Sequence, residues 1–112
     1  MRSITRVENV GINTIARLIR DAGEACTAYH DEHVRGIGGY RRIECDEVWS
    51  FVYSKKKNVS HAKAAPEGSG DAWTFSALDA DSKMAVSYMI GDRTGQTAIE
   101  FMDDLRSRVL PP

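Results

Sequence analysis

The sequence has few cysteines and lacks a long apolar run, and each absence excludes a class of protein. Only two of its 112 residues are cysteine, so a disulfide-rich secreted scaffold is excluded and reduced cytosolic thiols are expected. No stretch approaches the ~20 apolar residues of a membrane-spanning helix, and no signal peptide opens the chain. We therefore expect a cytoplasmic protein without a membrane partner.

The sequence also lacks a large excess of positive or negative charge, although the charged residues are unevenly spread along it. The formal net charge is −1 at pH 7, which by itself does not indicate a nucleic-acid partner. Residues 1–20 nevertheless hold four arginines against one acid, and residues 54–63 hold four lysines and no acid. Local basic segments of this kind can bind phosphate even when the total charge is near zero.

Residues 2–20 predict two short helices joined by a tight turn. Apolar residues recur at helical spacing in the second helix, at Ile15, Leu18 and Ile19. Gly11 suits the turn because glycine readily adopts a positive φ, and Asn13 is the expected N-cap of the second helix. The spacing is typical of a helix-turn-helix motif, so residues 1–35 are expected to form a helix-turn-helix-like DNA-binding segment.

The segment RRIECDEVWSFVY, residues 41–53, predicts a buried strand, although three carboxylates lie in its middle. Side chains alternate between the two faces of a strand, so Asp46 is expected on the face opposite the core. Carboxylates in an apolar strand are unfavourable unless a positive group meets them. One interpretation is that Asp46 forms an ion pair with Arg41, Arg42 or a lysine of 55–57.

The remaining segments predict a loop, a hairpin and a helix. Residues 54–71 read as a long loop, and residues 72–79 and 83–91 as two hairpin strands. Residues 94–110 predict a helix with an apolar face at Ile99, Met102, Leu105 and Val109. On its solvent face we expect Asp104 to pair with Arg108. The expected fold class is α/β in the broad sense, of the α+β kind, with three antiparallel strands and one helix after the N-terminal helices.

Two stretches, IECDEVWSFVYSKKKNV and GDAWTFSALDADSKMAVSYMIGDRTGQTAIEFMDDL, resemble the insertion-sequence transposases of the IS-one type. The D-E-x-W-S-F strand followed by three lysines, and the later G-D-R-T with its helix, carry the resemblance, which begins at about residue 3. It implies a ribonuclease-H-like catalytic domain over residues 40–112 with a DDE-type triad. The first acid of such a triad lies mid-way along the first strand, which corresponds to Asp46.

The resemblance implies DNA transposition, in which the protein binds insertion-sequence ends and target DNA, then cleaves and transfers strands in the nucleoid. Two divalent cations assist such phosphoryl transfer, and Mg²⁺ or Mn²⁺ prefers carboxylate oxygen. Asp46 is therefore the expected catalytic residue and metal ligand, with the metal expected only for the complete domain. A homo-oligomer is left open. The expected DNA-binding residues lie on the recognition helix and in the lysine run: Asn13, Thr14, Arg17, Lys55, Lys56 and Lys57.

The resemblance places the second and third acids of the triad beyond residue 112. We therefore expect a truncated ribonuclease-H-like unit that is inactive alone. Asp79 and Asp81 flank the predicted hairpin turn, where aspartate is common, and Asp92 is expected to cap the following helix, so none is favoured as a replacement ligand.

Two other functions and one other site stay open. The chain is alternatively a non-catalytic DNA-binding inhibitor derived from a truncated transposase, or an inactive remnant. One helix face carries Cys26, His30 and His33. They form either a partial zinc site or, as is commoner, an ordinary helix surface.

Overall fold

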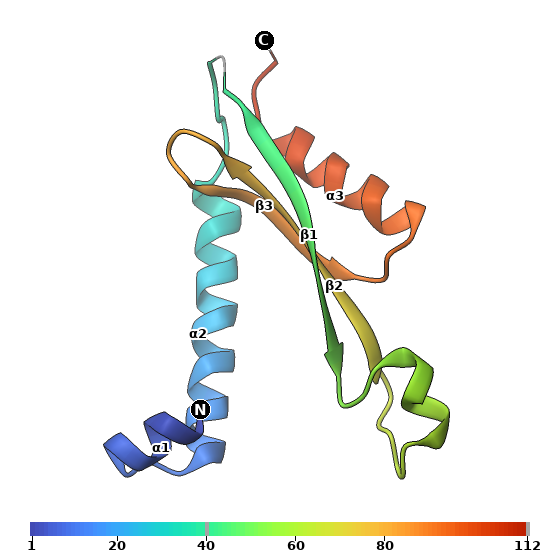
Figure 1. Ribbon diagram of the computed structural model, residues 1–112. Coiled ribbons are helices and arrows are strands. Elements are labelled where there is room, and N and C mark those ends of the chain that lie inside the picture. The colour runs from blue at the N-terminus through green and yellow to red at the C-terminus, as the bar shows by residue number, and fades with distance from the viewer. Residues whose placement is uncertain (40, 112) are drawn as a thin grey trace. The chain divides into compact units, whose positions relative to one another are not determined.

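The computed structural model describes residues 1–39 and 41–111, which belong to two compact units, residues 1–35 and residues 36–112. Figure 1 shows the order of the elements along the chain. Within the described residues, no helix is both long enough and apolar enough to cross a membrane.

The first unit consists of α1 (Arg2–Glu8) and α2 (Ile12–His33). The turn between them differs from the prediction. The positive φ, 51°, belongs to Asn9, whereas Gly11 is extended at φ −60° and is the N-cap of α2. Asn9 can take this role because asparagine tolerates the left-handed region better than most residues. Asn13, the expected cap, lies inside the helix.

Burial in the first unit is slight. Among residues 1–35, all of which the structure describes, Ile15 is the only buried side chain, and the expected apolar neighbours Leu18 and Ile19 are exposed. The helix continues through Gly23 to His33, so one unfavourable glycine does not end it. Most of the apolar face of α2 is thus open within this unit.

In the described part of the second unit, three strands form one antiparallel sheet in the order β1-β2-β3. They are β1 (Ile43–Val52), β2 (Gly70–Asp79) and β3 (Ala85–Gly91). The central strand β2 pairs along its length with β1, from Ile43 opposite Asp79 to Val52 opposite Gly70. Together with the helices, this confirms the predicted α+β class. Both β1 and β3 are edge strands in the part of the chain that the structure describes.

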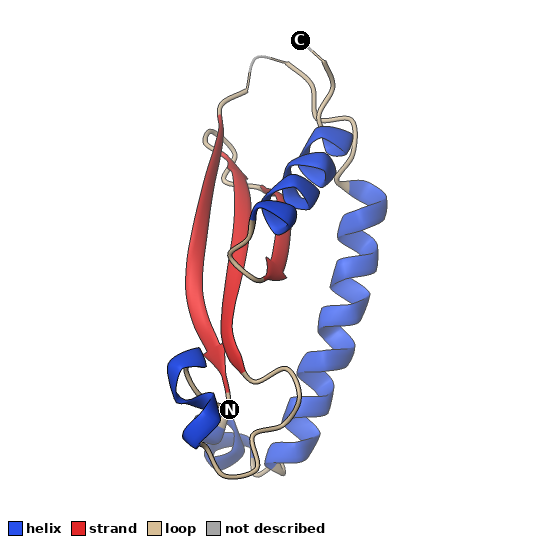
Figure 2. Cartoon of the chain, turned by 90° about the vertical axis from the view of Figure 1, so that its right-hand side faces the viewer, coloured by secondary structure: helices blue, strands red, loops and turns tan. Residues whose placement is uncertain are grey.

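The core lies between β2, β3 and α3 (Gly95–Arg108), which packs on one face of the sheet (Figure 2). Its buried members are Phe75, Ala77, Val86, Phe101 and Leu105. The rings of Phe75 and Phe101 meet with centroids 5.8 Å apart and planes tilted by 39°, a tilted arrangement that aromatic pairs favour. The opposite face carries exposed side chains, including Val48, Leu78, Tyr88 and Ile90.

The helix α3 begins close to the predicted residue 94, but Thr94 caps it instead of Asp92, and it turns a different face to the core. Thr94 is the N-cap, and its hydroxyl accepts a hydrogen bond from the backbone N–H of Thr97 at 3.3 Å. Ile99 and Met102, expected on the core face, are 58% and 51% exposed. The buried stripe is instead Phe101, Leu105 and Arg108. These positions are four and three residues apart and so share one face.

The Asp104–Arg108 pair exists, but its predicted place on the solvent face is wrong. The Arg108 guanidinium donates to Asp104 Oδ2 at 2.7 Å from Nε and to Oδ1 at 2.9 Å from Nη2. The buried Ser87 hydroxyl on β3 donates to the same Oδ2 at 2.5 Å. The pair thus joins α3 to β3. A charge enters this interface because the carboxylate accepts two hydrogen bonds from the planar fork of arginine.

We predict that Arg108→Ala lowers the free energy of unfolding by about 3 kcal/mol, because it leaves the Asp104 carboxylate without its partner in a largely desolvated site. Urea unfolding of the full chain measures this as a lower midpoint at unchanged slope. Arg106→Ala is the matched control: Arg106 is exposed on the same helix, and its loss should change stability by less than about 0.5 kcal/mol. Equal effects of the two changes would contradict this role of Arg108.

Candidate functional site

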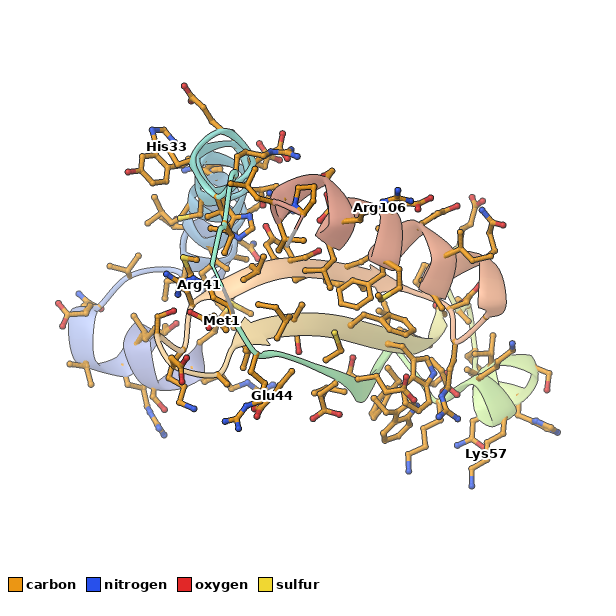
Figure 3. The ribbon with its side chains drawn as sticks, turned by 90° about the horizontal axis from the view of Figure 1, so that it is seen from above. Met1, His33, Arg41, Glu44, Lys57 and Arg106 are labelled. Carbon is orange, nitrogen blue, oxygen red and sulfur yellow. The ribbon has the colours of Figure 1, made fainter. Side chains whose placement is uncertain are left out.

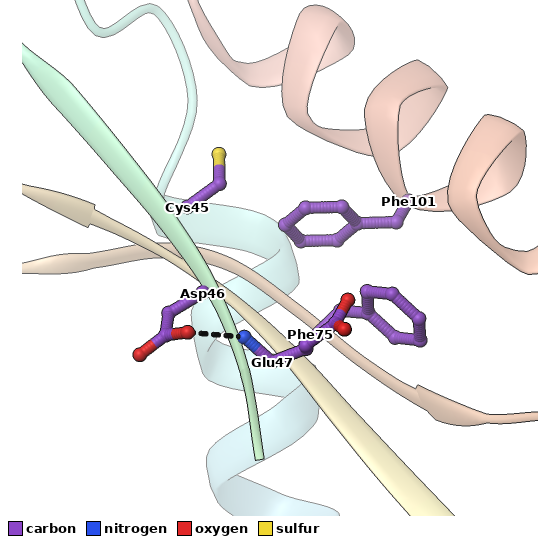
Figure 4. A pocket seen from close by; sticks show the side chains of 5 residues that line it. All are labelled: Cys45, Asp46, Glu47, Phe75 and Phe101. Carbon is purple, nitrogen blue, oxygen red and sulfur yellow. Dashed lines mark hydrogen bonds between the residues drawn. The ribbon is translucent and has the colours of Figure 1, made fainter. Parts of the chain in front are cut away.

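Asp46 lies in the middle of β1, opposite Ser76 of β2, which in turn lies opposite Tyr88 of β3. Its carboxylate is exposed and accepts a hydrogen bond from the backbone N–H of Glu47 at 2.8 Å. Figure 4 shows this carboxylate on one side of the strand, with Cys45 and Phe101 on the other. The side chain is thus on the sheet face that α3 does not cover, as the alternation of the strand predicted.

Three of the cations proposed as ion-pair partners of Asp46 contact other groups. Arg41 binds Asp79 at 2.6 Å, Arg42 binds Glu44 at 3.2 Å, and the Lys55 amine lies 5.2 Å from the centroid of the Trp49 ring. Over residues 1–39 and 41–111, no ion pair involves Asp46.

The acids of β1 are tolerated because this strand is not buried, contrary to the prediction. Glu44 and Asp46 are among the eight exposed residues of the ten in β1. Water solvates their carboxylates. The third acid, Glu47, is half-buried on the α3 side and binds Arg93 through Oε1 at 2.6 Å from Nε. The Arg93 guanidinium carbon lies 4.9 Å from the centroid of the Trp73 ring.

A cavity of about 280 Å³ adjoins β1 beside α3, lined by Cys45, Asp46, Glu47, Phe75 and Phe101. Partial desolvation raises the pKa of the Cys45 thiol, although the residue as a whole is exposed. A raised thiol pKa lowers the thiolate fraction at neutral pH, and the thiolate is the nucleophile. This cavity therefore does not activate its cysteine.

Asp79 is a structural residue, as the turn composition predicted. Its side chain is fully buried and accepts hydrogen bonds from the Ser82 hydroxyl at 2.5 Å and from Arg41 at 2.6 Å. Weaker backbone contacts come from the N–H groups of Asp81 and Ser82 at 3.5 and 3.4 Å. The Ser82 hydroxyl, and then Arg41, hold the pKa of Asp79 below its usual value against the opposing effect of burial.

The residues expected on the recognition helix lie in the first turns of α2. Asn13 and Arg17 are exposed, four residues apart on one face of the helix, and Thr14 beside them is half-buried. The structure therefore leaves Asn13 and Arg17 accessible to a ligand.

The lysine run lies in a more ordered segment than the predicted loop. Lys55 precedes the 3₁₀ helix η1 (Lys56–His61), and Lys55, Lys56 and Lys57 are all exposed. Figure 3 shows Lys57 on η1, directed away from the strands. Two contacts hold the segment: the Tyr53 hydroxyl donates to the carbonyl of Lys63 at 2.6 Å, and the Lys56 backbone N–H donates to Asp71 at 2.9 Å.

Metal-ligand groups are absent from the part of the chain that the structure describes. No three side chains of histidine, cysteine, aspartate or glutamate within residues 1–39 and 41–111 are grouped so that they can hold an ion. On α2, the His33 ring stacks on Tyr29 with centroids 3.9 Å apart, and Cys26 is exposed. These contacts are those of an ordinary helix surface, one of the two interpretations given for Cys26, His30 and His33.

Sequence reasoning missed a cluster of aromatic and cationic side chains at the η1 end of the sheet. Trp49 and Trp73 lie directly opposite each other in register, and Lys55 and Arg93 lie over their rings. The alternation of β1 predicts that Trp49 shares a face with Phe51, but the cross-strand partner depends on a register that one strand does not specify.

Comparisons with protein-family models, curated proteins and solved structures give no match.

The lowered pKa of Asp79 predicts an acid-sensitive contribution to stability. An aspartate of the unfolded chain titrates near ~3.9, and Asp79 in the folded chain titrates below its ordinary value. The contribution is therefore fully present above about pH 4 and is lost as the pH falls through the folded value. Thermal melts from pH 7 to pH 2 should show a shallower acid decline for Asp79→Asn, which has no carboxyl group to protonate at this position, and also for Ser82→Ala, in which the folded pKa of Asp79 lies closer to its unfolded value. An Asp79→Asn profile that parallels that of the parent protein would contradict the assignment.

Proposed function

We propose that this chain is the DNA-binding and first-acid portion of a DNA transposase of the IS-one type. The observation that carries the proposal is Asp46, an exposed carboxylate in the middle of a strand with no ion pair among the described residues. A structural ion pair was the main alternative, but Arg41, Arg42 and Lys55 contact other groups and no ion pair of the described residues involves Asp46. The sequence resemblance assigns the same residue as the first catalytic acid.

DNA recognition is assigned to the start of α2. A recognition helix places its N-terminal residues against base edges in the major groove. The exposed Asn13 and Arg17 suit that role, because asparagine pairs with adenine and arginine with guanine through two hydrogen bonds each. Thr14 is half-buried and is assigned a contact only through its accessible part.

Phosphate binding is assigned to the exposed lysines Lys55, Lys56 and Lys57. Contacts to phosphate position a protein on DNA without reading its sequence. The contacts that anchor η1 at Lys56 and Lys63 reduce the conformational entropy that binding would otherwise remove.

The metal centre of the proposed activity needs more than the described residues supply. Mg²⁺ or Mn²⁺ would take Asp46 as one carboxylate ligand, but a two-metal centre requires further acids, and the described residues bring no group of three together. These residues alone therefore do not fit a two-metal centre. The proposal assigns the other acids to elements outside this sequence, which would complete the catalytic domain.

We predict that Arg17→Ala weakens binding to a duplex that the full chain selects from a random pool, by ~1–3 kcal/mol if Arg17 makes a bidentate base contact. Lys57→Gln should weaken binding to all sequences alike and reduce the slope of log affinity against log salt by about one. Fluorescence anisotropy with labelled DNA across a salt series measures both effects.

Arg106→Ala and Lys83→Gln are the controls for this titration. Each removes the same charge from an exposed position outside the assigned DNA-binding residues, so neither should change base specificity. The proposed DNA-binding surfaces are wrong if the controls and the test variants have the same affinity and salt slope.

A second prediction tests whether Asp46 is structural. In EDTA, Asp46→Asn should change the free energy of unfolding by less than about 0.5 kcal/mol, because the carboxylate is exposed and forms no described ion pair. Glu47→Gln, its neighbour, loses the Arg93 pair and should cost up to about 1 kcal/mol. Urea unfolding of both variants makes the comparison. A larger loss for Asp46→Asn would make Asp46 a structural residue.

DNA cleavage assays distinguish the catalytic proposal from a non-catalytic one. The 112-residue chain should bind DNA but not nick supercoiled plasmid with Mg²⁺ or Mn²⁺, because it supplies only the first acid. Metal-dependent nicking that Asp46→Ala abolishes would contradict this assignment. If the protein is a non-catalytic DNA-binding protein, its function depends on Asn13 and Arg17 but not on Asp46. This holds even for a chain extended with the missing acids.

A further inference from the structure

Exposed aromatic rings lie side by side with the basic segment at one end of the sheet. Trp49 and Phe51 of β1 are 40% and 47% exposed, and their ring centroids are 5.8 Å apart. Trp73 of β2 lies opposite Trp49 in register and is half-buried, packed against the core. We call Trp49, Phe51 and Trp73 the aromatic strip. Two large rings of this strip are accessible without any movement of the backbone.

Cationic side chains surround the aromatic strip. The Lys55 amine lies 5.2 Å from the Trp49 centroid, and the Arg93 guanidinium lies 4.9 Å from that of Trp73. A hollow of about 160 Å³ beside Trp73 is lined by Lys56, Asp71, Trp73, Asp92, Arg93 and Thr94. The strip is thus bordered by positive groups from the segment that follows β1 and from the segment that follows β3.

Some of the acidic side chains at this end of the sheet form an ion pair or a hydrogen bond with neighbouring groups. Glu47 binds Arg93, and Asp71 accepts the backbone N–H of Lys56, while Asp92 also lines the hollow. Residues 54–63 add four lysines without an acid. The net charge of the side chains around the exposed rings Trp49 and Phe51 is therefore positive.

The chemistry of this surface distinguishes between ligands. Nucleic-acid bases stack on accessible aromatic rings while lysines contact the phosphates, and this combination is typical of single-strand binding. The bases of a duplex are stacked on one another, so their faces are not available to a protein ring. An apolar protein partner would be favoured by aliphatic neighbours, whereas here the Lys55 amine lies over Trp49 and Asp71 lies opposite Phe51 in register.

The lysine over Trp49 does not block such stacking. A cation over an exposed ring is held only weakly, and Lys55 carries its amine on a flexible stem. A base that stacks on Trp49 can displace this amine, which then lies where the phosphate of the same nucleotide needs a cation. The contact seen in the free protein thus leaves the ring available to a nucleotide.

We propose that the aromatic strip, with Lys55, Lys56 and Lys57, binds unpaired nucleotides of a single-stranded nucleic acid. The inference rests on the proposed function only in assigning the lysines to phosphate. It adds that the bound strand is unpaired and that Trp49 and Phe51 stack on its bases. Duplex recognition by Arg17 is a separate contact in the other unit.

Intrinsic fluorescence provides a direct test, because the two tryptophans of the sequence, Trp49 and Trp73, both lie in the strip. Titration of the full chain with a 15-nucleotide oligothymidylate at about 0.1 M salt should quench this emission. A duplex of the same length should bind with less quenching. An oligouridylate of equal length distinguishes DNA from RNA as the source of the strand.

Variants separate stacking from charge. Trp49→Leu and Phe51→Leu should each weaken anisotropy-detected oligothymidylate binding by about 5- to 100-fold, the range expected for loss of one stacked base. Trp49→Phe keeps an aromatic face and should restore most of the affinity. Tyr88→Leu removes an exposed ring from the opposite sheet face and should leave single-strand affinity unchanged. Thermal melts establish that each variant is folded.

The results distinguish failure of this inference from failure of the proposed function. The inference is overturned if the Trp49 and Phe51 variants bind oligothymidylate as the parent does, or if the duplex binds tighter and quenches equally. The duplex-binding part of the proposed function is overturned separately, if Arg17→Ala leaves affinity for the selected duplex unchanged. Single-strand affinity that falls with Trp49→Leu and returns with Trp49→Phe supports the inference in either case.

Discussion

The packing of α3 on β2 and β3 is the interaction on which the rest of the second unit depends. Phe101 meets Phe75 in the apolar part of this contact, and Arg108 with Asp104 joins the helix to Ser87 in the polar part. The apolar contact stabilises the packing. The polar contact fixes the orientation of α3 on the sheet, because a bidentate ion pair tolerates little displacement. Together they fix which face of the sheet is the core.

This packing also determines what β1 exposes. The helix lies over β2 and β3, so β1 extends beyond its cover, and the strand presents acids near its middle and aromatic rings toward its η1 end. Asp46 is on one face and Trp49 with Phe51 on the other, by alternation. One strand thus carries both the proposed metal ligand and the proposed stacking surface, on opposite faces.

Local sequence was sufficient to predict some of these features and insufficient for others. Alternation in β1 placed Asp46 on the face opposite the core, and the turn composition indicated local hydrogen bonding at Asp79, which the structure shows. The prediction that β1 is buried was wrong because burial depends on which element covers a strand. The sequence of the strand does not encode that. The predicted buried face of α3 was wrong for the same reason: Arg108 is inside because Asp104 meets its charge, and the Ser87 hydroxyl on β3 donates to that carboxylate.

The position of β1 at the edge of the described sheet has a consequence for self-association. A ten-residue strand paired on one side only presents open backbone groups that can template pairing with another copy. Glu44, Asp46 and Glu47 lie in this edge, and two such edges brought together antiparallel would oppose like charges across the new ladder, which is unfavourable. These carboxylates therefore protect the chain against edge-to-edge polymerisation, whatever else Asp46 does.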